Sequence, residues 1–133
     1  MELRRVHPSE FATVRQLLLA NGWQHRIGTE AEFSGLLKSS QRAEVAILKG
    51  EIVGFARAIS DGQSNGYLSM VVVSEAHRGK GIGRALVEHV MGEASTMTWV
   101  LRAGRPEAEE FFSKLGFKTS TVAMERLRVE RDA

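Results

Sequence analysis

The stretch Arg78-Gly79-Lys80-Gly81-Ile82-Gly83 separates a run typical of a buried strand from a run typical of an amphipathic helix. Residues 67–73, Tyr-Leu-Ser-Met-Val-Val-Val, are rich in the β-branched and aromatic side chains that favour a strand. Residues 82–93 have the spacing of one helical face, which is apolar over its first half. Three glycines therefore stand where a strand is expected to turn into a helix.

This junction has the chemistry of a phosphate site. A helix N-terminus has unpaired N–H groups and a partial positive charge, and glycines allow an anion to approach those groups closely. Arg78, Lys80 and Arg84 add fixed positive charge at the same place. The alternative reading is a glycine-rich turn with basic neighbours that binds nothing.

The glycine spacing excludes two common nucleotide motifs. A Walker loop requires Ser or Thr after its Gly-Lys pair, whereas Gly81 follows Lys80 in this chain. The dinucleotide pattern Gly-x-Gly-x-x-Gly also fails, because Arg84 or Leu86 stands where its third glycine belongs. The pattern that remains is Arg-x-x-Gly-x-Gly at a strand–helix junction.

With this pattern the chain resembles the GNAT superfamily of acyl-CoA-dependent N-acetyltransferases, which use it to hold the pyrophosphate of coenzyme A. Residues 107–117 are similar to the fourth helix of that family and its Gly-Phe ending. The resemblance implies an α/β fold of the α+β type, in the order β-α-α-β-β-β-α-β-α-β. Its single sheet would be mixed and mostly antiparallel, with a V-shaped splay between the fourth and fifth strands.

Periodicity and turn signals along the chain predict the same order of elements. Strands are expected at residues 2–6, 43–49, 52–60, 67–73, 97–102 and 118–127, with a tight hairpin turn at Gly50-Glu51. Helices are expected to begin near Pro8, Thr29, Ile82 and Pro106, the third of them running to about Ala94. One domain would cover residues 1–133, with a C-terminal end that is abbreviated or completed by a partner chain.

Composition narrows the classes of function. A formal net charge of +2 gives no indication of a nucleic-acid partner, and the absence of cysteine excludes a thiol nucleophile and a cysteine-based zinc site. The histidines are too scattered to suggest a metal site. No apolar run reaches membrane-spanning length, so we expect a cytoplasmic protein, monomeric or homodimeric, with no membrane partner.

The resemblance also implies acetyl-CoA as the cosubstrate and an amine on a small molecule, peptide or protein as the acceptor. Main-chain groups of the fourth strand would pair with the pantetheine arm, and an N–H near Val71 would hold the thioester oxygen. The expected coenzyme contacts are Val71, Val73, Arg78, Gly79, Lys80, Gly81, Ile82, Gly83 and Arg84.

The catalytic residues of the family do not transfer to this chain. The position at which many members place a tyrosine acid is Phe112, which has no proton to give to a thiolate. Asp61 and Tyr67 are the candidates for acid–base work; the alternatives are an Asp-Gly turn residue and a packing aromatic. Trp23 and His25 are candidates for shaping the acceptor pocket, although His25 also fits a solvated loop.

Two classes of function follow from these residues. The first is an enzyme that acetylates a primary amine, and the second is a non-catalytic module that binds acyl-CoA and regulates a partner. A phosphate loop serves both equally well, whereas Phe112 favours the second. A nucleotide-phosphate binder that uses the same helix N-terminus is a third reading, which competition between ATP and coenzyme A would reveal.

Overall fold

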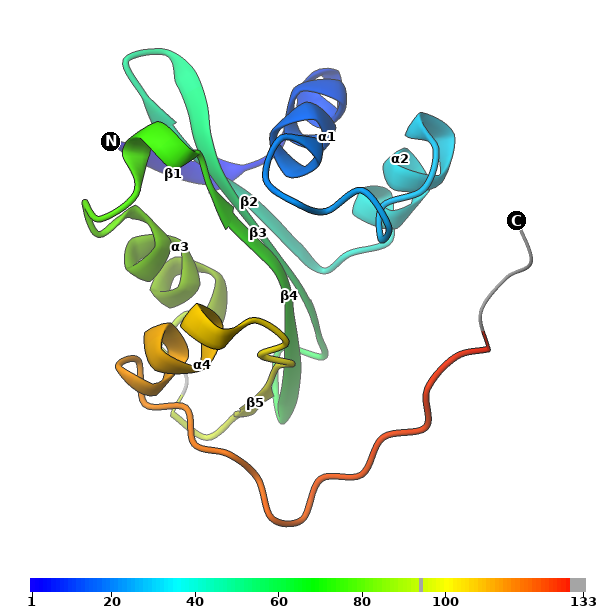
Figure 1. Cartoon of the computed structure of the whole chain (residues 1–133), viewed down its shortest axis with the longest axis vertical. Helices are drawn as coiled ribbons and strands as arrows, with labels where there is room; N and C mark the ends of the chain where they lie inside the picture. Colours follow the sequence, from blue (N-terminus) through cyan, green and yellow to red (C-terminus); the bar gives the residue numbers. More distant parts are fainter. Residues whose placement is uncertain (94, 130–133) are drawn as a thin grey trace. The chain divides into compact units, whose positions relative to one another are not determined.

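A computed structural model describes residues 1–93 and 95–129 of the chain (Figure 1). The chain divides into two compact units, of which the first is Met1–Arg102 and the second begins at Ala103. Each unit is described by itself. Within the described residues, no helix has the length and apolar character needed to cross a bilayer.

The first unit is built on one five-stranded sheet with the strand order β1-β2-β3-β4-β5. The first three neighbouring pairs are antiparallel, and β4 and β5 are parallel. The predicted mixed, mostly antiparallel sheet in an α/β fold is therefore confirmed. The strands are β1 (Glu2–Arg5), β2 (Arg42–Leu48), β3 (Glu51–Ser60), β4 (Asn65–Val73) and β5 (Thr98–Val100).

Helices cover both faces of this sheet, α1 and α2 on one side and α3 on the other (Figure 1). The main core lies under α1 and α2, where Leu18 and Phe33 pack with Phe55 and Val72 of the sheet. On the other face α3 lies close to β3, because a Cβ at Gly54 would stand only 2.7 Å from Leu86 Cδ1. The helical segments of this unit are η1 (Pro8–Glu10), α1 (Phe11–Leu19), α2 (Glu30–Lys38), η2 (Glu75–His77) and α3 (Ile82–Met91).

Local signals explain where α2 and α3 begin and end. Thr29 Oγ1 accepts from the Glu32 N–H at 3.1 Å, and Glu32 Oε1 accepts from the Thr29 N–H at 2.9 Å, which is a reciprocal capping box. Helix α3 ends at Met91 because Gly92, with φ 71°, leaves the helical conformation. Ala94, the expected end of this helix, lies outside the described residues.

The hairpin between β2 and β3 turns one residue earlier than predicted. Lys49 and Gly50 both have positive φ, 51° and 79°, as a two-residue turn matched to strand twist requires. Glu51 already belongs to β3, so the predicted turn at Gly50-Glu51 is wrong by one position. Lys49 adopts a left-handed conformation, which is uncommon for a residue other than glycine, so its residue type did not indicate the turn.

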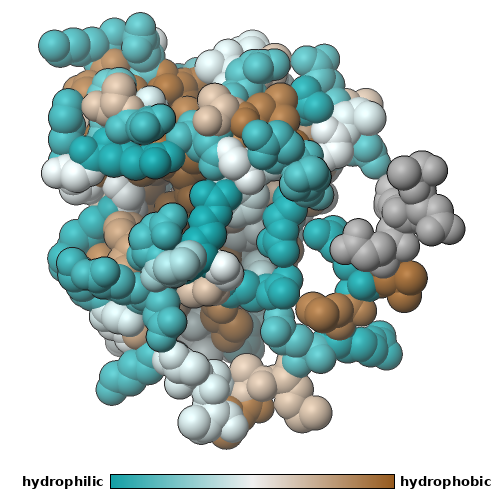
Figure 2. Space-filling view, viewed as in Figure 1, coloured by the Kyte–Doolittle hydropathy of each residue, from teal (hydrophilic) through white to brown (hydrophobic). Residues whose placement is uncertain are grey.

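The second unit contains α4 (Pro106–Ser113), with Pro106 in the first turn as predicted. The strand predicted at residues 118–127 is wrong, because the described residues there form no strand. The Ser120 hydroxyl accepts from the N–H groups of Val122 and Ala123 at 3.1 and 2.9 Å, which bends the chain. Figure 2 shows apolar side chains standing out along this segment, and Met124 is 96% exposed. β-branched residues favour an extended chain, but a strand also needs a partner.

Candidate active site

Strand β4 carries an extra residue in its middle. Phe55 of β3 pairs with Val72, and Arg57 pairs with Ser69. Ala56 alone therefore stands opposite both Met70 and Val71, which defines a β-bulge. Met70 has a φ of 51°, a left-handed conformation that is strained for a side chain of this kind. Sequence reasoning missed this bulge, since no glycine marks it.

Beyond the bulge, the outer edge of β4 has main-chain groups that no neighbouring strand uses, and one of them, the Val73 carbonyl, accepts from Arg78 Nε. The Ser74 N–H donates to the Val53 carbonyl at 2.8 Å, so Ser74 faces β3. Because main-chain direction alternates along a strand, Val73 and Val71 turn their N–H and C=O groups to the opposite edge. On that edge β5 pairs only with residues 65–67 of β4, and the described part of the chain puts no strand beside the rest.

The glycine loop follows this edge after the single turn of η2. Gly79 and Gly81 have φ values of 77° and 83°, and a Cβ at either position would meet no atom within 4 Å. Gly81 is the N-cap of α3 and supplies no side-chain acceptor. The first helical bond is from the Ala85 N–H to the Gly81 carbonyl, so the N–H groups of residues 82–84 have no partner within the helix. The first turn holds no acidic side chain.

The three cations expected at this loop differ in their partners. Arg78 Nε donates to the Val73 carbonyl at 3.1 Å, and its Nη2 donates to Asn21 Oδ1 at 2.5 Å. Arg84 forms an exposed ion pair with Glu88, with 2.8 Å between Arg84 Nε and the carboxylate. Among the described residues Lys80 has no ion pair. Arg78 thus ties the loop to β4 and to the end of α1, while Lys80 keeps its charge available.

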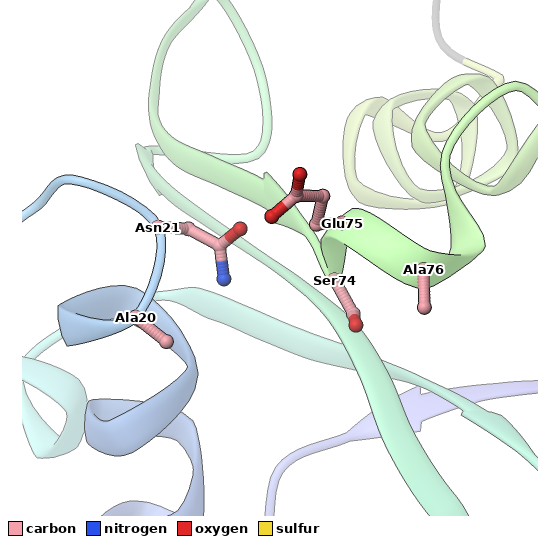
Figure 3. A pocket seen from close by; sticks show the side chains of 5 residues that line it. All are labelled: Ala20, Asn21, Ser74, Glu75 and Ala76. Atoms are coloured by element: carbon pink, nitrogen blue, oxygen red, sulfur yellow. The ribbon is translucent and has the colours of Figure 1, made fainter.

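An open groove of about 530 Å³ lies beside the loop, between the end of α1 and η2. Figure 3 shows the Asn21 amide and the Glu75 carboxylate pointing toward one another across it. The sequence indicated Asn21 only as part of a helix stop, and no spacing signal connects it with Arg78. The groove is lined by Ala20, Asn21, Ser74, Glu75 and Ala76.

Asp61 is held within its own turn. Its carboxylate accepts from the Ser64 hydroxyl and from the N–H groups of Gln63, Ser64 and Asn65, the last three at 2.8, 2.8 and 3.2 Å. The Ser64 hydroxyl contributes most, followed by the three N–H groups, and together they hold the pKa of Asp61 well below its ordinary value. A carboxylate with so low a pKa is a weak base, which favours the turn-residue reading.

Tyr67, the second acid–base candidate, lies on β4 where that strand is paired on both sides, with Ile59 of β3 and Val100 of β5. It is half-buried. Directly paired residues share a face of a sheet. Arg57 and Ile59 stand two and four residues after Phe55 along β3, so they lie on the same face as Phe55, toward α1 and α2. Tyr67 and Ser69 therefore form, with Arg57 and Ile59, a partly open floor on that face.

Arg57 is a buried arginine that sequence reasoning missed. The signal was present, because it is the one charged residue inside the apolar run from Ile52 to Ser60 and stands at an inward position of that run. It is only 7% exposed. Its Nε donates to the Ser40 hydroxyl at 2.7 Å.

The residues expected at the acceptor side divide into two kinds. Trp23 packs against the core under α1 and α2, so it has a structural role there. His25 is exposed in the loop between those helices. Phe112 is buried in the second unit and makes edge contacts with Phe111 and Phe117, at ring distances of 4.9 and 5.7 Å. No group of three or more metal-ligating side chains occurs in the described residues.

Comparison with known proteins places this geometry in a family. Residues 39–119, more than half of the chain, match the family model described as the acetyltransferase (GNAT) domain. No curated protein matches the chain. The fold is shared with a GNAT-family protein of Xanthomonas campestris pv. campestris, at 23% identity and TM-score 0.78 over 96% of this chain and 94% of that one.

Two further solved structures share the fold. A ribosomal-protein-alanine N-acetyltransferase of Brucella melitensis biovar Abortus has 21% identity and TM-score 0.76, with 97% of this chain and 100% of that one covered. An aminoglycoside acetyltransferase from an uncultured soil metagenomic sample has 25% identity and TM-score 0.69, with 96% and 98% covered. Because the family model matches more than half of its residues, the chain belongs to the GNAT acetyltransferase family.

Proposed function

We propose that this protein is an N-acetyltransferase that moves an acetyl group from acetyl-CoA to a primary amine, by direct attack in a ternary complex. The supporting observation is that the edge of β4 left without a neighbouring strand is followed, after the short η2, by the glycine loop. An extended thioester arm that ends in phosphates needs both surfaces next to each other. The proposal keeps the cytoplasmic location and the monomer or homodimer expected from the sequence.

The glycine loop fits the phosphates of acetyl-CoA. The space at the Cβ positions of Gly79 and Gly81 is open, the first turn of α3 has N–H groups to donate, and no carboxylate competes for them. Lys80 adds a cation without a partner among the described residues. The main chain of Val71 and Val73 would hold the arm along β4.

When bound, acetyl-CoA supplies an activated acetyl group, whose carbon bonds the amine nitrogen as its bond to sulfur breaks. The N–H near Val71 would donate to the carbonyl oxygen, where negative charge develops. Only about one in 2,500 molecules of an amine with pKa 10.4 is neutral at pH 7, so the site must favour the neutral amine. Tyr67 and Asp61 are the acid–base candidates of the proposal, and the lowered pKa of Asp61 makes it the weaker of the two as a base for this proton.

The chain has no tyrosine at position 112 to give a proton to the leaving sulfur. A simple thiol has a pKa of about 8.5, so water can supply that proton near neutral pH. The alternative is a non-catalytic acyl-CoA-binding module, and the observation that favours it is Phe112, packed between two other phenylalanines.

Calorimetric titration with acetyl-CoA and coenzyme A, with ATP as the control, tests the proposal. We expect micromolar binding, roughly 8 kcal/mol, that is specific to the coenzymes. A thiol-release assay with a panel of amines then separates the two functions. Coenzyme binding without amine-dependent thiol release would support the regulatory module, and no coenzyme binding would overturn both.

A further inference from the structure

Arg57 stands out as a largely buried arginine without a counter-charge. It lies in the middle of β3, and among the described residues it forms no ion pair with a carboxylate. Burial lowers the pKa of its guanidinium, and Tyr67 is the group that acts in the opposite direction. Burying an unpaired charge destabilises a fold considerably. Core packing alone therefore does not account for an arginine at this position.

The free end of this side chain is its terminal nitrogen pair. Nε is used, since it donates to the Ser40 hydroxyl at 2.7 Å. Nη1 and Nη2 make no hydrogen bond with any described residue, and neither is among the buried polar atoms that lack a partner. Both nitrogens therefore reach solvent, although the residue as a whole is only 7% exposed. Ser40 holds the guanidinium in place and leaves its outer edge to a ligand.

Arg57 lies beside the part of β4 whose outer edge has no neighbouring strand among the described residues. Arg57 pairs directly with Ser69, and Val71 follows two residues later along β4. At a strand rise of about 3.3 Å per residue, Ser69 and Val71 are no more than about 7 Å apart along the strand. An acceptor amine placed near Val71 would thus have Arg57 within the length of a small molecule.

We propose that the acceptor of this enzyme is an amine that also carries a carboxylate, an amino-acid-like substrate, and that Arg57 binds that carboxylate through Nη1 and Nη2. This inference rests on the proposed acetyltransferase function. The planar guanidinium matches a carboxylate with two parallel hydrogen bonds, which lysine does not do. A phosphate accepts from the same fork, so phosphate-bearing amines form a separate arm of the test.

Matched pairs of acceptors give the sharpest test. Steady-state thiol release is measured with a panel of L-amino acids and with the corresponding amino-acid amides, which keep the amine and lose the negative charge. We expect kcat/KM to be roughly 10- to 100-fold higher for the acid of the preferred pair, as for loss of a charged hydrogen bond. Arg57→Gln should lower kcat/KM for the acid to the value for its amide. Arg57→Lys should keep part of the preference for the acid.

The control variant is Arg5→Gln. Arg5 is exposed and donates to the main-chain carbonyls of Gln41 and Ser40 at 2.9 and 3.1 Å, so it carries the same charge beside the same segment. Arg5→Gln should leave the ratio of kcat/KM for the acid to kcat/KM for the amide unchanged. Circular dichroism and coenzyme titration of each variant show whether it folds and whether the loop still binds.

The outcomes are distinct. If acid and amide react equally and Arg57→Gln changes neither, the carboxylate proposal is overturned while coenzyme binding and transfer keep the proposed function. If only phosphate-bearing amines, such as phosphoethanolamine, show the Arg57-dependent preference, the anion is a phosphate and the carboxylate proposal is overturned. If coenzyme binds and no acid in the panel is acetylated, or if coenzyme does not bind at all, the inference falls, in the second case together with the proposed function.

Discussion

The two connections at the ends of β4 treat their main-chain N–H groups in opposite ways. Before β4, the Asp61 carboxylate accepts from three N–H groups of its own turn and from the Ser64 hydroxyl. After β4, the glycine loop begins α3 with no capping side chain and no acid in its first turn. One turn contains its own anion, and the other lacks one. The difference supports the proposal that the first turn is complete as folded, whereas the second binds an anion from outside.

Placing an anion in the glycine loop should have the largest effect. Gly81→Glu would bring a carboxylate to the N-terminus of α3 and repel the phosphates, and we expect acetyl-CoA affinity to fall at least 100-fold in calorimetry. Gly62→Glu is the matched control, because Gly62 has a similar φ of 74° and equally open space, but lies in the Asp61 turn. Both variants carry about 1–2 kcal/mol of backbone strain. Equal loss of affinity in the two would remove the loop from its role.

Removing the anion from the first turn should affect stability and spare coenzyme binding. Asp61→Asn weakens the acceptor for three N–H groups, so the urea midpoint should fall at pH 7 while acetyl-CoA affinity stays unchanged. The pKa of Asp61 is lowered in the folded protein, so the unfolded chain binds more protons as the pH falls. The contribution of Asp61 to the free energy of unfolding is therefore complete above the ordinary pKa of about 3.8, and it is lost progressively as the pH falls below that value. The gap between wild type and variant should narrow in urea titrations toward pH 3, and a gap that widens would contradict this account.

The charges around the glycine loop should contribute unequally. Lys80→Gln removes a cation without a partner among the described residues, and we expect acetyl-CoA affinity to fall roughly three- to fivefold at low salt. Arg84→Gln should have a smaller effect, because its charge is already paired with Glu88 at 2.8 Å. Calorimetry at two salt concentrations checks this, and the opposite ranking would mean that Arg84 exchanges Glu88 for the phosphates.

The smallest effect is expected at a position outside both turns. Phe112→Tyr would return a hydroxyl to the site of the family tyrosine, but a thiol with pKa near 8.5 leaves without an acid. We expect kcat at pH 7.5 to change by less than about twofold. A tenfold rise in thiol release would show instead that protonation of sulfur limits turnover in the wild-type chain.

Local signals predicted the junction from β4 to α3 because it depends on neighbours in sequence. Glycines at 79 and 81, a preceding β-branched run and a following apolar face all lie within one short segment. The Thr29–Glu32 capping box was equally readable, since its two partners are three residues apart. The family resemblance then supplied the single mixed, mostly antiparallel sheet, which periodicity cannot give.

The features that sequence reasoning missed depend on partners elsewhere in the chain. The bulge at Met70 exists only because β3 offers one residue, Ala56, opposite two of β4. A strand was predicted at residues 118–127, but the described segment bends at Ser120 and forms no strand. Arg57 was visible as a charge in an apolar run, but its lack of a counter-charge is a fact of three-dimensional packing.

The bulge in β4 also has a genetic consequence. Removing the codon for Met70 would leave Val71 as the single residue opposite Ala56, and the pairs on either side, Phe55 with Val72 and Arg57 with Ser69, would keep their faces. We expect such a deletion to yield an uninterrupted strand and a folded protein. Under the proposed function, a single in-frame triplet therefore separates a regular fourth strand from the bulged strand that faces the coenzyme.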